Sequence, residues 1–92
     1  MNKEFVREKH LEKAFDEMHK IKPEVLVKRE NNSKYSVKLS HGGREVVLTE
    51  QMKDGLTNMT YLEFKGEVKA FKRYYDAEQV ATTILKGLVW EL

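Results

Sequence analysis

The sequence predicts an α+β domain with an N-terminal helix, an antiparallel sheet of about five strands and a C-terminal helix, both helices being packed on one sheet face. Apolar residues recur at helical spacing near each end of the chain. Between these stretches, apolar and polar residues alternate with period two, and short turn-forming runs separate the alternating segments. Because 92 residues suit one small core, we expect a single domain over residues 1–92.

The first helix is predicted over about residues 3–20. Its apolar residues fall on one face at i, i+3, i+4 and i+7 spacing, and they are Leu11, Ala14, Phe15 and Met18. Pro23 ends the helix, because proline disfavours helical backbone at the residue before it and has no amide hydrogen to donate. The apolar face is expected to pack on the sheet.

Three strands of a meander are predicted next, over residues 25–28, 34–39 and 46–48. The first two are separated by Asn31, Asn32 and Ser33, which are residues that favour turns. The second and third are separated by His41, Gly42 and Gly43, where the glycines accept positive φ. Residues 49–56 are expected to form either a loop or one short helical turn, with Asp54 and Gly55 as the turn signal.

A second hairpin is predicted from residues 59–64 and 67–75, which are joined at Lys65 and Gly66. Its second strand alternates poorly. If Val68 faces inward then Lys72 does so too, whereas if Phe71 faces inward then Lys69 accompanies it. A bulge near residue 70 or an edge position in the sheet would resolve this conflict.

The C-terminal helix is predicted to begin at Asp76, which forms a capping box with Gln79. Its apolar residues recur at helical spacing, and they are Val80, Ala81, Ile84, Leu85 and Leu88. Gly87 weakens its end by about 1 kcal/mol relative to alanine, so the last residues can turn away as a tail. The two helices are expected to pack through Leu11, Phe15, Met18, Val80, Ile84 and Leu88, which leaves the opposite sheet face available to a partner.

Composition and motifs argue against several functions. The formal charge is +2, from 17 basic and 15 acidic residues, far below that of a dedicated nucleic-acid binder. The absence of cysteine excludes thiolate catalysis and favours the cytoplasm. We see no signal peptide and no apolar run of the roughly 18 residues that a membrane span needs, so we expect no membrane partner.

No catalytic, cofactor or metal site stands out. Glu12, Asp16 and His19 share one face of the first helix, but interspersed charges are usual on a solvated face, and a closed metal site needs more ligands. The loop over residues 41–44 lacks the third glycine of an esterase oxyanion loop, and no nucleophile elbow is present. We therefore expect that the chain is not an enzyme and that it binds no cofactor and no metal.

The leading hypothesis is a small non-enzymatic interaction or regulatory module that acts through protein–protein contacts. Its predicted partner-binding residues are Val89, Trp90 and Leu92, because this tail is more apolar than the surface of a monomer usually is. The partner is expected to be another protein or a second copy of the chain, which would form a homodimer.

The alternative hypothesis is nucleic-acid binding through a basic and aromatic hairpin at residues 61–75. This segment holds five of the chain's eight Phe and Tyr residues, which would stack on bases if they were exposed and would join the core if they were not. The cations that would neutralise phosphates are Lys34, Lys38, Lys65, Lys69, Lys72 and Arg73. Burial of the rings is favoured, because so small a chain needs its aromatics for the core.

Overall fold

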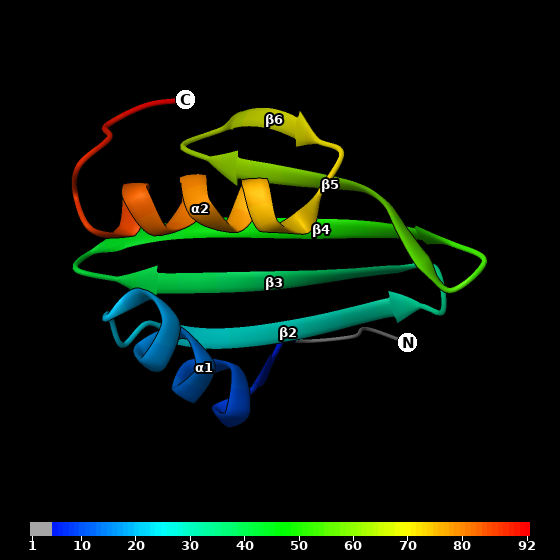
Figure 1. Cartoon of the computed structure of the whole chain (residues 1–92), viewed down its shortest axis with the longest axis horizontal. Helices are drawn as coiled ribbons and strands as arrows, with labels where there is room; N and C mark the ends of the chain where they lie inside the picture. Colours follow the sequence, from blue (N-terminus) through cyan, green and yellow to red (C-terminus); the bar gives the residue numbers. More distant parts are fainter. Residues whose placement is uncertain (1–4) are drawn as a thin grey trace.

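A computed structural model describes residues 5–92 as one six-stranded antiparallel sheet with a helix at each end of the chain, both on the same sheet face (Figure 1). The elements are β1 (Val6–Arg7), α1 (Lys9–His19), β2 (Glu24–Asn31), β3 (Lys34–His41), β4 (Arg44–Lys53), β5 (Leu56–Phe64), β6 (Glu67–Phe71) and α2 (Tyr74–Leu85). Each strand pairs with the next along the chain. The predicted fold class is confirmed, with six strands in place of the expected five or so.

The core lies between the helices and one face of the sheet. Its rows follow the strand register, in which Val37 stands opposite Val27 on one side and Leu48 on the other, and Leu48 stands opposite Leu62. Phe15 from α1 and a stripe of α2 close this layer from above, the stripe being Ala77, Ala81, Ile84 and Leu85. The other face carries no helix and is called the open face below; Leu26, Lys38, Val47 and Glu63 form one row across it.

The segment predicted as a loop or a short helical turn at residues 49–56 belongs instead to a long hairpin. β4 continues to Lys53, and β5 begins at Leu56 after a two-residue turn in which Asp54 and Gly55 both have positive φ. This turn type matches the twist of the flanking strands. Sequence reasoning missed the strand because its inward position is Glu50, a buried carboxylate that breaks the apolar alternation.

The N-terminal helix is shorter than predicted. Residues 3 and 4 lie outside the described part of the chain, and the residues that follow, Val6 and Arg7, pair with β2 as a short strand. The amide of Glu8 then donates to the Val25 carbonyl over 2.8 Å, and α1 begins at the next residue. Met18 was expected in the core and is exposed, because Phe15 and His19 are the residues that turn inward one helical turn apart.

The C-terminal helix also differs at both ends. α2 begins at Tyr74, and no side chain caps it, because the carboxylate of Asp76 pairs with Arg73 over 2.9 and 3.0 Å. It ends at Leu85, since Gly87 turns the chain at φ 78°. Leu88 therefore leaves the helix and is exposed, contrary to the prediction that it packs on the sheet.

The last strand, β6, lies at the edge of the sheet. Lys69 stands opposite Leu62 and shares the helix-covered face with Phe71, whereas Val68 and Ala70 are on the open face. The edge position resolves the conflict in its pattern, because four of its five residues are exposed. No helix in the described residues is long and apolar enough to cross a membrane.

Candidate protein-binding site

A groove of about 540 Å³ lies between the C-terminal end of α1 and the outer side of α2. We call it the helix groove, and it is lined by Met18, His19, Lys20, Tyr75, Gln79, Thr82, Thr83, Lys86 and Leu88. Its residues come from the last turn of α1, from the whole length of α2 and from the turn after α2. The helix groove is therefore formed by segments that are far apart in the sequence.

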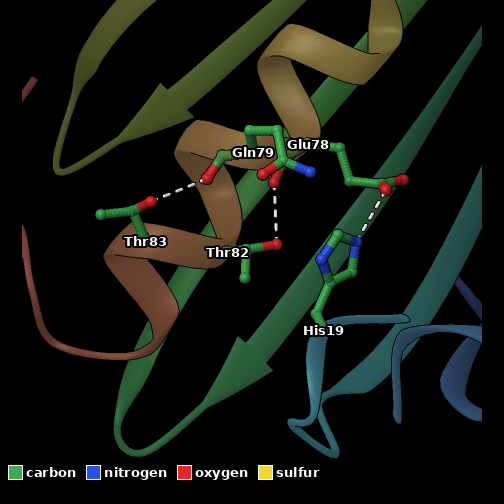
Figure 2. A network of polar contacts seen from close by, with 5 residues as sticks. All are labelled: His19, Glu78, Gln79, Thr82 and Thr83. Atoms are coloured by element: carbon green, nitrogen blue, oxygen red, sulfur yellow. Dashed lines mark hydrogen bonds and ion pairs between the residues drawn. The ribbon is translucent and has the colours of Figure 1, made fainter. Parts of the chain in front are cut away.

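One wall of the groove depends on a contact between the two helices (Figure 2). His19 Nε2 donates to Glu78 Oε1 over 2.8 Å, and the two side chains are only 7% and 14% exposed. The His19 ring also packs on Phe15, with ring centroids 4.9 Å apart. The hydrogen bond links the last turn of α1 to α2, and the ring contact within α1 positions the histidine that makes it.

The threonines of α2 offer little hydrogen-bonding capacity to a ligand. The Thr82 hydroxyl donates to the Glu78 carbonyl over 2.8 Å, and the Thr83 hydroxyl donates to the Gln79 carbonyl over 2.9 Å (Figure 2). Each hydroxyl proton is thus already used within the helix. Neither hydroxyl has a proton left to donate to a ligand.

The groove has a mixed lining of polar, apolar and positively charged side chains. Three large side chains line the groove while remaining largely exposed, namely Met18 (67%), Tyr75 (58%) and Leu88 (71%). Lys20 and Lys86, both exposed, stand on its rim. None of the nine described residues that line the groove is an aspartate or a glutamate.

The comparisons with protein-family models, curated proteins and solved structures found no match for this chain. Exposed apolar side chains gathered in a concave surface are typical of sites that bind another protein. Lysines on the rim favour a partner of negative charge.

A buried acidic cluster lies between the helices and the sheet. Burial raises the pKa of the Glu50 carboxyl above its ordinary value, a hydrogen bond from Thr57 over 3.4 Å opposes this, and the nearby Glu78 carboxylate adds to it. Burial also raises the pKa of the Tyr74 hydroxyl, as do Glu78 and Glu50. In residues 5–92 no three histidine, aspartate or glutamate side chains are grouped so that they could hold a metal ion.

Substituting Glu50 by glutamine is expected to stabilise the protein at neutral pH. The pKa of Glu50 is raised in the folded chain above the ordinary 4.5. The folded protein therefore loses stability as the pH rises through this raised pKa and the buried carboxyl ionises, whereas below about pH 4.5 the carboxyl is protonated and nothing is lost. Because glutamine does not ionise, Glu50→Gln should raise the free energy of unfolding at pH 7 by about 1 kcal/mol. Urea denaturation of both proteins from acid to neutral pH measures it, and equal pH dependence of the two would contradict it.

The predicted tail residues differ in their exposure. Val89 is half-buried and packs against the core, whereas Trp90 is 66% exposed. The tail is held in place by the Arg44 guanidinium, 5.4 Å from the centre of the Trp90 ring, and by Lys65, whose Nζ donates to the Trp90 carbonyl over 3.4 Å. Leu92 is also exposed. The tail is thus folded onto the body of the domain, with Trp90 facing outward.

The six cations predicted to bind nucleic acid are divided among separate places. Lys34 and Lys38 lie on the open face, where they pair with Glu30 over 3.4 Å and with Glu45 over 3.8 Å. Lys69 lies on the helix-covered face, and the remaining three are in turns: Lys65, Lys72 and Arg73. The structure therefore forms no single basic surface from these six residues.

The aromatic residues of the same hairpin contribute mainly to the core. Phe64 is buried, and Phe71 and Tyr74 pack against the buried residues. Tyr61 is half-buried on the open face, and Tyr75 is the exposed ring that lines the helix groove. The sequence pattern does not predict the groove, because it places Met18 and Leu88 in the core. The usable signal was Gly87, which marks where the helix ends before Leu88.

Proposed function

We propose that this chain is a small non-enzymatic interaction module that acts through protein–protein contacts, and that the helix groove binds a segment of its partner. The observation that carries the proposal is the gathering of Met18, Tyr75 and Leu88, all largely exposed, in one groove. Covering such side chains with a partner removes apolar surface from water, which is the main driving force of protein association. The absence of cysteine favours action in the cytoplasm.

The partner segment is expected to combine apolar side chains with negative charge. Apolar residues would fill the groove, and aspartate or glutamate beside them would approach Lys20 and Lys86 on the rim. The groove is present in the chain without a partner, and the hydrogen bond between His19 and Glu78 links the two helices that form it. A preformed site loses less entropy when it binds.

A selection from a random displayed peptide library tests this proposal. We expect the selected peptides to be rich in Asp, Glu, Leu and aromatic residues, and we expect their affinity, measured by fluorescence anisotropy, to fall as salt is added. The Lys20→Glu/Lys86→Glu variant should bind such a peptide about tenfold more weakly, because two favourable charge pairs become repulsive.

The control is Lys53→Glu, which makes one such charge reversal at the last residue of β4, away from the groove; it is compared with the rim variant on the basis of each reversal. It should leave the affinity of the selected peptide unchanged. Peptides with no acidic enrichment, or equal weakening by the control and by the rim variant, would contradict the proposed partner chemistry.

A further inference from the structure

The outer edge of β6 presents a free strand to a partner. β6 pairs with β5 on one side only, and no other strand in the described residues covers its second side. Four of its five residues are exposed, so its backbone donors and acceptors are accessible as well as its side chains. An edge of this kind is a template for another strand.

The charges of β6 are arranged so that the strand complements itself. Glu67 and Lys69 lie on the same face of the sheet and flank Val68. In an antiparallel pair centred on Val68, Glu67 of each copy stands opposite Lys69 of the other, and the two Val68 side chains face each other on the open face. A pair of strands is stabilised by opposite charges that stand directly across from each other, and also by apolar side chains in that arrangement.

The neighbouring registers are unfavourable. Centring the pair on Glu67 places two glutamates opposite each other, and centring it on Lys69 places two lysines opposite each other. A register centred between two residues pairs each residue with its neighbour in the sequence. Because successive side chains point to opposite faces of a sheet, the helices of the two copies would then lie on opposite faces. The register on Val68 therefore joins the sheets with their helices on the same face and with both charge pairs attractive.

The tail lies where it can add to this contact. The bond from Lys65 to the Trp90 carbonyl places the tail beside the start of β6, where the C-terminus is seen in Figure 1. In the register on Val68, the turn that holds Lys65 in one copy lies beside Phe71 at the end of β6 in the other. The exposed Trp90 ring of each copy would then lie near the end of β6 in the other.

We infer that a second copy of this chain pairs antiparallel with β6, in the register centred on Val68, and joins the two six-stranded sheets into one. The dimer surface is separate from the helix groove, so each can exist without the other. With strands of five residues, the dimer should be weak and should form as the protein concentration rises.

Charge reversal and mixing test the inference. Sedimentation equilibrium of the wild-type chain should show a monomer–dimer equilibrium. Glu67→Lys gives β6 two positive side chains at these positions, and Lys69→Glu gives it two negative ones, so each variant alone should dimerise about tenfold more weakly. An equimolar mixture of the two variants should dimerise as the wild type does, because both cross-strand pairs are attractive again. Recovery in the mixture also shows that each variant is folded.

Control variants separate this surface from the groove. Lys53→Glu and the Lys20→Glu/Lys86→Glu variant should keep the dimerisation of the wild type, whatever their effect on peptide binding. A wild-type chain that stays monomeric at the highest concentration reached would overturn the inference. So would single charge reversals without effect, or a mixture of the two variants that fails to dimerise.

Discussion

Leu48→Ala should lower the free energy of unfolding by about 3 kcal/mol, the largest effect that we expect from a single substitution in this chain. Leu48 is fully buried on the central strand β4, between Val37 and Leu62 in the register and in the layer covered by α2. Its removal leaves a cavity that flanking strands cannot close, because both are fixed by their hydrogen bonds. In a domain whose total stability is about 5–15 kcal/mol, this is a large fraction.

Leu56→Ala is the matched control. It deletes the same atoms from a leucine that is exposed at the start of β5, so the expected loss is below about 0.5 kcal/mol. Urea denaturation followed by Trp90 fluorescence and by circular dichroism measures both. Similar losses for the two variants would mean that the core does not lie between the sheet and α2.

The second large effect is expected from His19→Ala, which should cost about 2–3 kcal/mol and should also weaken peptide binding in the helix groove. The substitution leaves the buried Glu78 carboxylate without the hydrogen-bond donor that α1 supplies. This carboxylate lies near the Glu50 carboxyl, and no histidine then links the two helices. It also removes the packing of the ring on Phe15. The last turn of α1, which carries Met18 and Lys20, would no longer be held against α2.

Two conservative variants show whether the hydrogen bond or the charge matters at this contact. His19→Gln keeps a side-chain donor and should lose less stability than His19→Ala. Glu78→Gln keeps an acceptor, removes a charge beside Glu50 and should be nearly neutral. Denaturation and peptide binding are measured on all three variants. If His19→Gln and His19→Ala were equally destabilised, the hydrogen bond between the helices would not be the reason for the loss.

The strands could be predicted where inward positions are apolar and turns carry glycine. Val37 and Leu39 alternate with polar residues in β3, and Gly42 and Gly43 do form the turn that follows. The same pattern does not predict the long hairpin of β4 and β5, because the inward-facing residue near the end of β4 is the charged Glu50. The short β1 could not be predicted either, since a strand of two residues has no period to detect.

The site was harder to predict than the fold. Met18 and Leu88 are apolar at helical spacing, which is also the pattern of core residues, and only the three-dimensional structure shows that they are exposed. Helical spacing also places His19 one turn after Phe15, but its partner Glu78 is 59 residues away. The tail was singled out for its composition, which could not separate the inward Val89 from the outward Trp90.

The most direct test of the proposed function is to map a selected acidic peptide on the protein by NMR. Amide chemical shifts of the ¹⁵N-labelled chain would be followed as the peptide is added, at a protein concentration where the chain is monomeric. We predict that the largest changes fall at Met18, Tyr75 and Leu88 and at their neighbours in the helix groove. Changes confined to the open face or to β6, or no saturable change at all, would contradict the assignment of the groove as the partner-binding site.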